Sequence, residues 1–229
     1  MFTSEEWTAI GLSLKIGSIA TLGALPVAVL VAFVLARGRF PGKSLLDGLV
    51  HMPLVLPPVV TGYVLLILFG RRGLIGAPLA EHLGIVFSFR WTGAALAAGI
   101  MGFPLMVRAI RLSMEAIDPR IEQAASTLGA SPIWVFATVT LPLAFRGIMA
   151  GAVLAFAKAL GEFGATITFV SNIPGQTQTI PAAIYTHTQT PGGDLGALRL
   201  SAVAAGIALV ALVLSEIAVR RARQGRSFE

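Results

Sequence analysis

Five long apolar segments dominate the hydrophobic pattern of this 229-residue chain, and shorter polar stretches separate them. A helix that crosses a membrane needs about 20 mostly apolar residues, a length that these segments reach or approach. We therefore predict an all-α fold: a polytopic bundle of five transmembrane helices that forms one domain over residues 1–229, with its core at about residues 10–219. The segments are residues 16–35, 50–69, 91–110, 147–170 and 202–219.

The five segments differ in strength. The third is the weakest, because Gly102 and Pro104 interrupt it. Residues 180–190 are too short and too polar to cross a membrane, so they add no sixth span.

Residues 118–142, between the third and fourth apolar segments, carry the end signals of two short helices. Asp118, followed by a proline, is a good N-cap, and Gly129 stands where a left-handed C-cap falls. A Ser-Pro pair then repeats the start and opens a second short helix, residues 133–138, which runs into a Leu-Pro pair. The pattern predicts a rigid helical hairpin outside the membrane.

Composition supports a membrane protein, since 55% of the residues are hydrophobic and 12% are charged, against about a quarter charged in soluble domains. The basic residues also predict the orientation, because cytoplasmic connections are enriched in Lys and Arg. One set of connections holds four: Arg71, Arg72, Arg90 and Arg199. The other holds eleven: Arg37, Arg39, Lys43, Arg108, Arg111, Arg120, Arg146, Arg220, Arg221, Arg223 and Arg226.

We therefore expect the N-terminus outside, and the hairpin and the C-terminal tail in the cytoplasm. The net charge of +6 follows from this flanking charge and from contact with anionic lipid, so it does not indicate a nucleic-acid partner. The chain has no cysteine, and its three histidines stand apart from one another. With no catalytic or metal-binding motif either, we expect no enzyme activity, no cofactor and no metal.

The prolines of the second segment, Pro53, Pro57 and Pro58, remove amide donors at a depth where lipid offers no substitute. Such irregular backbone must be buried in protein or line a watery path. A simple kink at the start of the helix is an equally good explanation.

The fourth segment combines close packing with charge. Gly147, Gly151 and Ala155 recur every four residues, which predicts a smooth ridge for helix packing, and Lys158 and Glu162 continue this spacing. Ionisable groups inside a membrane are costly and commonly functional, so both are candidates for a translocation path. Alternatively, the two charges only neutralise each other.

Polar side chains follow in the same segment: Thr166, Thr168, Ser171 and Asn172. Their neutral hydrogen-bond donors suit a path for an oxyanion, because they bind the ion without trapping it by charge. Hydroxyl groups in membrane helices also bond harmlessly to their own backbone, and this alternative carries equal weight.

The hairpin QAASTLGASPIWVFATVTLP, from Gln123 to Pro142, resembles the signature of permease subunits of binding-protein-dependent ABC importers. That signature is Glu-Ala-Ala, three residues, Gly, nine residues, Ile, one residue, Leu-Pro. Gln123 replaces the acid and Val139 the isoleucine, while Glu122 stands one position before the triplet. The resemblance implies that the hairpin docks into a separate ATPase subunit through Glu122, Gln123, Ala124, Ala125, Gly129 and Trp134.

Within this family the chain resembles molybdate permeases, through FPGKSLLDGLVHMPLVLPPVVTGY, FPLMVRAIR and AKALGEFGATITFVSNIPGQTQTIPAAIY. Sulfate and thiosulfate permeases share the Gly-Glu-Phe-Gly turn, so another tetrahedral oxyanion, tungstate included, is the alternative substrate; an ATP-independent channel is a more distant one. The resemblance implies a bacterial plasma (inner) membrane location and ATP hydrolysis by a separate subunit. It also implies three partners: two ATPase subunits, an oxyanion-binding protein outside and a second copy of the chain.

Overall fold

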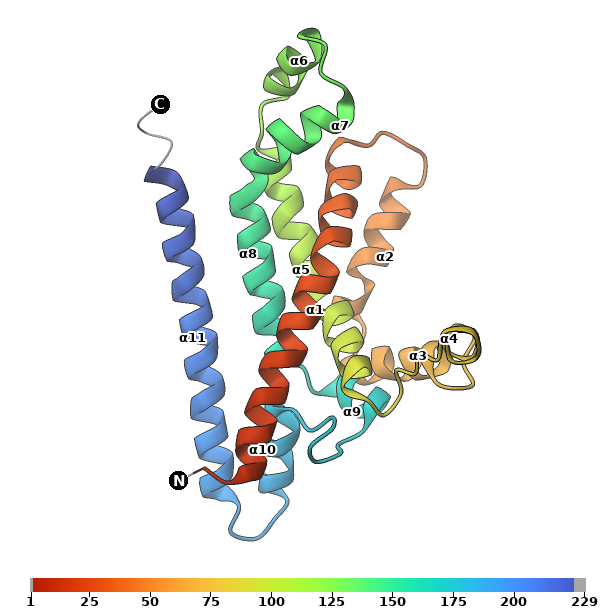
Figure 1. Cartoon of the computed structure of the whole chain (residues 1–229), viewed down its shortest axis with the longest axis vertical. Helices are drawn as coiled ribbons and strands as arrows, with labels where there is room; N and C mark the ends of the chain where they lie inside the picture. Colours follow the sequence, from red (N-terminus) through yellow and green to blue (C-terminus); the bar gives the residue numbers. More distant parts are fainter. Residues whose placement is uncertain (1, 225–229) are drawn as a thin grey trace.

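The computed structural model of the chain describes residues 2–224, and all regular elements in that range are helical (Figure 1). They are α1 (Ser4–Arg37), α2 (Lys43–Val55), α3 (Pro58–Phe69), α4 (Gly76–Leu83), α5 (Trp91–Glu115), α6 (Pro119–Thr127), α7 (Pro132–Val135), the π-helix η1 (Phe136–Thr140), α8 (Leu141–Leu160), α9 (Gly164–Val170), α10 (Ile180–Thr188) and α11 (Asp194–Gln224). The predicted all-α fold is confirmed. Arg226 lies outside the described residues, as do the side chains of Arg220, Arg221 and Arg223.

Helix α5 forms the centre of the bundle, with α1 and α8 packed along it. Its small residues let the neighbours approach closely: Gly102 lies against Ala155 of α8, and Gly99 faces Ala20 of α1. This segment, predicted to be the weakest span, forms one continuous helix with Pro104 inside it. Its glycines and alanines give it a lower mean hydropathy than the other spans. Such small residues suit a helix that faces protein on most sides.

Four described helices are long and apolar enough to cross a membrane, namely α1, α5, the run Pro132–Leu160 and Asp194–Leu214 of α11. A fifth span exists if α2 and α3 count as one, but these two helices meet at an angle of 114°. The break falls at Leu56 and Pro57. Pro57 and the next residue, Pro58, both lack an amide hydrogen. Helix α3 consequently leaves the bundle sideways and forms an arm with α4 (Figure 1).

The predicted fourth span, residues 147–170, is also broken. Helix α8 ends at Leu160, and α9 begins at Gly164 after a turn. The two breaks lie against each other: a Cβ atom on Gly164 would be 2.8 Å from Pro58 Cβ, and one on Gly62 of α3 would be 2.9 Å from Ala165 Cα. The second half of each broken segment therefore packs on the other.

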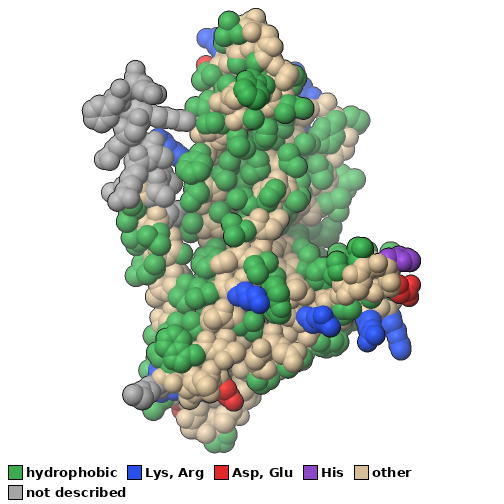
Figure 2. Space-filling model, viewed as in Figure 1, with side chains coloured by type: hydrophobic (Ala, Val, Ile, Leu, Met, Phe, Trp, Pro, Cys, Tyr) green, Lys and Arg blue, Asp and Glu red, His purple; other side chains and the backbone are tan. Residues whose placement is uncertain are grey.

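The outer surface of the long helices is largely hydrophobic on the face shown in Figure 2, whereas charged side chains gather on the arm. Many apolar side chains of these helices remain exposed in the single chain, for example Leu22, Leu30 and Val27 of α1. Such a surface is expected where lipid or a second chain covers the protein.

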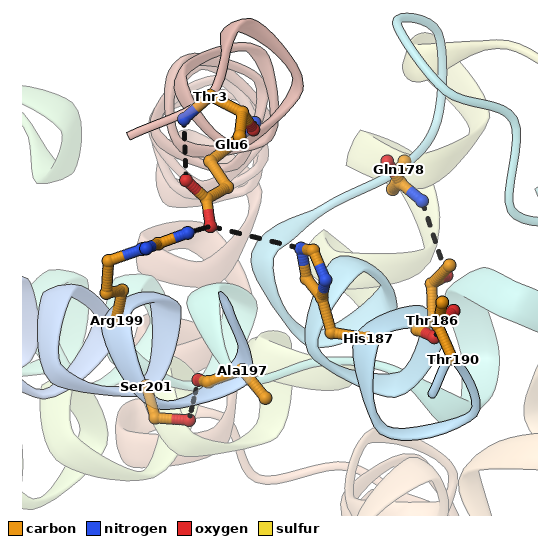
Figure 3. Close-up of polar contacts among 9 residues, drawn as sticks. All are labelled: Thr3, Glu6, Gln178, Thr186, His187, Thr190, Ala197, Arg199 and Ser201. Carbon is orange, nitrogen blue, oxygen red and sulfur yellow. Dashed lines mark hydrogen bonds and ion pairs between the residues drawn. The ribbon is translucent and has the colours of Figure 1, made fainter. Parts of the chain in front are cut away.

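An ion-pair cluster around the buried Glu6 ties the N-terminus of α1 to α10 and α11 (Figure 3). The Glu6 side chain is fully buried, and its Oε1 atom accepts a hydrogen bond of 2.7 Å from Arg199 Nη2. The same oxygen lies 4.0 Å from His187 Nε2, and the backbone N–H of Thr3 donates to Oε2 at 2.7 Å. We call Glu6, His187 and Arg199 the N-terminal cluster. It lies at the end of the bundle opposite the hairpin (Figure 1).

Candidate functional site

The hairpin between α5 and α8 has the predicted end signals at its first helix. Asp118 caps α6, because its Oδ1 atom accepts a hydrogen bond of 2.9 Å from the backbone N–H of Arg120. Gly129 has a φ of +86°, so it adopts the left-handed conformation expected beyond a helix end. The Ser131 hydroxyl then accepts the backbone N–H of Trp134 and starts α7.

The second helix of the hairpin does not end where the sequence predicts. Residues 133–138 belong to a continuous run, in which α7 passes through the π-helix η1 into α8. Because Pro142 has no amide hydrogen, a helix end is expected near it. Instead, a wide π turn, closed by the hydrogen bond from the Leu141 N–H to the Phe136 carbonyl, lets the helix continue through Pro142. The hairpin is therefore continuous with a long helix of the bundle.

An apolar patch covers the tip of the hairpin. Trp134, predicted as a docking residue, is 64% exposed, Gln123 and Ala124 are also exposed, and Ala125 is half-buried. Sequence reasoning missed Leu128 and Ile133, which are 89% and 82% exposed. The available signal was their position in a capped hairpin too small to bury them. Apolar groups this exposed are typical of a docking surface.

Glu122 has a different environment from the other predicted docking residues, because its carboxylate faces the bundle. Arg37, the last residue of α1, donates to both of its oxygens, at 2.9 Å from Nε and 3.2 Å from Nη2. The Thr140 hydroxyl of η1 donates to Oε1 at 2.7 Å. We call Arg37, Glu122 and Thr140 the hairpin clamp. Arg37 was not predictable as a partner of Glu122, since it lies 85 positions away in the chain.

The predicted ion pair forms at the break between α8 and α9. Lys158 Nζ lies 2.8 Å from Glu162 Oε2, and the side chain of Glu162 is 1% exposed, against 29% for Lys158. The other carboxylate oxygen accepts the backbone N–H of Ala165 at 2.9 Å. Glu162 therefore holds the turn into α9 in addition to pairing with Lys158, whose side chain is partly exposed.

The remaining predicted path residues lie further along α9 and the loop after it. The Thr166 hydroxyl donates to the Phe163 carbonyl at 2.9 Å, and that of Thr168 to the Gly164 carbonyl at 2.8 Å. Both threonines bond to their own backbone, so neither has a hydrogen left to donate to a ligand in this conformation. Asn172 donates from Nδ2 to the Thr186 hydroxyl at 2.8 Å, and Ser171 is exposed.

The structure thus gathers the candidate residues into two separate places, the hairpin at one end and the α8–α9 break within the bundle (Figure 1). Within residues 2–224, no group of three or more Asp, Glu or His side chains is arranged to hold a metal ion. Near the break the Lys158 side chain is partly exposed, and Ser171 is exposed beyond the other end of α9. The charge of Lys158 can attract an anion electrostatically.

Comparison with known proteins identifies the class. Residues 24–224 match the family model described as binding-protein-dependent transport system inner membrane component. The chain belongs to this family, which consists of the membrane subunits of ABC importers.

Several individual permeases are similar to the chain over most of its length. The chain is 57% identical over 228 residues to the molybdenum transport system permease protein ModB of Escherichia coli K12, covering 99% of this chain and 100% of that one. It is 56% identical to ModB of Haemophilus influenzae, over 92% of both chains. The sulfate transport system permease protein CysW of Synechococcus elongatus is 40% identical over 95% of this chain and 75% of that protein.

Solved structures share the fold. A bacterial ABC transporter that imports alginate matches with a TM-score of 0.75 and 17% identity, over 96% of this chain and 80% of that one. At 17% identity this match shows a shared fold and nothing more.

Proposed function

We propose that the chain is the permease subunit of an ATP-driven importer that carries molybdate across the plasma membrane. The observation that carries the proposal is the identity of 57% and 56% to two molybdenum permeases over nearly the whole chain. The 40% identity to a sulfate permease leaves another tetrahedral oxyanion as the second candidate substrate. The subunit itself is non-catalytic, and a separate subunit hydrolyses ATP.

The surfaces of the chain and its family support the proposed partners. Two ATPase subunits bind the importer, each docked on the hairpin of one permease chain, and the exposed apolar side chains of Leu128, Ile133 and Trp134 suit a protein groove. An oxyanion-binding protein delivers substrate at the opposite end. A second copy of the chain completes the path, and the exposed apolar helix faces offer it a surface.

The proposed orientation places the hairpin in the cytoplasm and the N-terminus outside. The distribution of Lys and Arg over the connections supports it, since eleven of 17 basic residues fall on the hairpin side. The described end of α11 lies on that side as well (Figure 1). The N-terminal cluster then lies near the surface that receives the binding protein.

Alternating access follows from these parts. ATP binding draws the two ATPase subunits together, and the hairpin passes the movement to α8, with which it is continuous. The substrate path runs past the α8–α9 break, where Lys158 attracts the dianion. Ser171 and Asn172 contribute neutral contacts, and Thr166 and Thr168 join them only if α9 rearranges, because both hydroxyls now bond to the backbone.

The first experiment measures cellular molybdenum by mass spectrometry at trace molybdate, in a strain without this chain and in the same strain complemented with it. Restoration of molybdenum that excess sulfate does not suppress is the expected result. Suppression by sulfate would move the chain to the sulfate group, and unchanged molybdenum would overturn the assignment. A passive channel predicts that no ATPase co-purifies with the chain.

Gly129 provides a test of the hairpin. A β-branched residue at its φ of +86° is strained by about 1–2 kcal/mol, while a Cβ there meets no neighbouring atom. We expect Gly129→Val to lower molybdate uptake about fivefold or more, with ATP hydrolysis retained and the chain still inserted. Gly129→Asn, whose side chain tolerates this conformation, is the matched control. Equal uptake by wild type and Gly129→Val would remove the hairpin from the coupling mechanism.

A further inference from the structure

Helix α6 has an unusual position, because it carries four of the predicted docking residues, Glu122, Gln123, Ala124 and Ala125, yet has no buried residue of its own. Hydrophobic packing therefore does not fix its position against the bundle. Its connections along the chain are the capped turn at Asp118 and the turn at Gly129. The carboxylate of Glu122 joins it sideways to the bundle through side-chain hydrogen bonds.

The hairpin clamp makes this connection with three charged or hydroxyl groups from three elements. Glu122 and Arg37 side chains are 17% and 22% exposed, and the guanidinium group binds both carboxylate oxygens. Arg37 also donates to the Ile117 carbonyl at 3.3 Å, just before α6. A two-point contact between planar groups fixes orientation as well as distance.

The third member of the clamp lies in the π-helix. Thr140 is 1% exposed and donates to the oxygen of Glu122 that also accepts from Arg37 Nη2. The segment η1 joins the hairpin to α8, and π turns inside helices commonly mark functional positions. The clamp therefore fastens α6 both to the end of α1 and to the start of the span formed by α8.

We propose that Arg37 is a positioning residue for energy coupling: through Glu122 and Thr140 it holds α6 in register with α1 and α8, so that a displacement of the docked hairpin moves both helices. The inference rests on the proposed function and adds α1 as a second route for the movement. Glu122 acts inward, toward the bundle, and the ATPase contacts come from the exposed residues of the hairpin.

The test uses the full importer, permease with its ATPase subunits, reconstituted in proteoliposomes with the binding protein and molybdate. The readout is the number of ATP molecules hydrolysed per molybdate taken up. For Arg37→Gln we expect this ratio to rise about tenfold, with the ATPase subunit still bound at wild-type stoichiometry. Arg37→Lys, which keeps the charge but not the two-point contact, should give an intermediate ratio, and the exchange Arg37→Glu with Glu122→Arg should restore part of the coupling.

The N-terminal cluster supplies a matched control, since Arg199 pairs with Glu6 at the other end of the same helix α1. Arg199→Gln removes a comparable ion pair, so it should lower stability without changing the coupling ratio. Thr140→Val removes one hydrogen bond and should give a smaller rise than Arg37→Gln.

Three outcomes overturn the clamp: a wild-type ratio in Arg37→Gln, equal rises in Arg37→Gln and Arg199→Gln, or loss of the ATPase subunit from Arg37→Gln, which would assign the pair to docking. If Arg37→Gln is not recovered as folded protein, Arg37→Lys and Thr140→Val decide by the same ratio. Failure of the wild-type complex to take up molybdate would instead refute the proposed function.

Discussion

Replacing Lys158 with Met should lower both the stability of the permease and its molybdate uptake, whereas adding Glu162→Gln should restore the stability alone. The single change leaves the Glu162 carboxylate, 1% exposed, without its cation. Removing one partner of a buried ion pair costs at least about 3 kcal/mol of stability. We expect a value at this lower end, because the Lys158 side chain is 29% exposed. Uptake falls about tenfold or more, because a charge-assisted contact to the dianion is lost.

The double variant separates pairing from transport. Glu162→Gln keeps an oxygen that can accept the Ala165 N–H, so the turn into α9 persists without a buried charge. The measurements are the melting temperature of the purified complex and the initial rate of uptake of radiolabelled molybdate. If uptake recovers together with the melting temperature, the two charges only neutralise each other, and the path does not use Lys158.

The sequence predicted the long helices of the bundle, because their apolar segments are local features. It also located irregular backbone at Pro57 and Pro58, but not its consequence. The bend of 114° depends on α3 finding a surface on α9, where Gly62 lies against Ala165. Such a contact joins residues about a hundred positions apart and leaves no local pattern.

The hairpin shows the same difference between local features, which the sequence predicts, and long-range contacts, which it does not. The caps at Asp118, Gly129 and Ser131 were predictable, because each involves atoms within a few residues. The role of Glu122 was not, since carboxylates at a helix start are common and its cation lies at the end of a distant helix. The sequence shows that a charged group needs a partner inside a protein, but not which of 17 basic residues supplies it.

The threonines of α9 show why a polar sequence is weak evidence for a path. Thr166 and Thr168 have the residue type that an oxyanion path needs, yet each donates its only hydroxyl hydrogen to a carbonyl three or four residues earlier. Both arrangements have the same sequence. Only the conformation that accompanies transport distinguishes them.

We expect Gly151→Leu to destabilise the bundle, because α8 and α5 are in backbone contact at this position. A Cβ atom there would be 2.9 Å from the Met106 carbonyl oxygen and 3.3 Å from Ile110 Cγ1. The carbonyl belongs to a buried helix and cannot move aside like a side-chain end. Overpacking of this kind costs about 3 kcal/mol or more, so we expect the melting temperature to fall by roughly 10 °C, with little monodisperse protein recovered in detergent.

Gly11→Leu on α1 is the matched control, because a Cβ atom at Gly11 meets no atom within 4 Å. It changes the same residue types in another membrane helix, so any effect of hydrophobicity or helix propensity is common to both variants. A melting temperature that falls equally in the two variants would contradict close packing of α8 on α5. A fall confined to Gly151→Leu would confirm that the small-residue ridge of Gly147, Gly151 and Ala155 sets the distance between these helices, and with it the position of the α8–α9 break that carries Lys158.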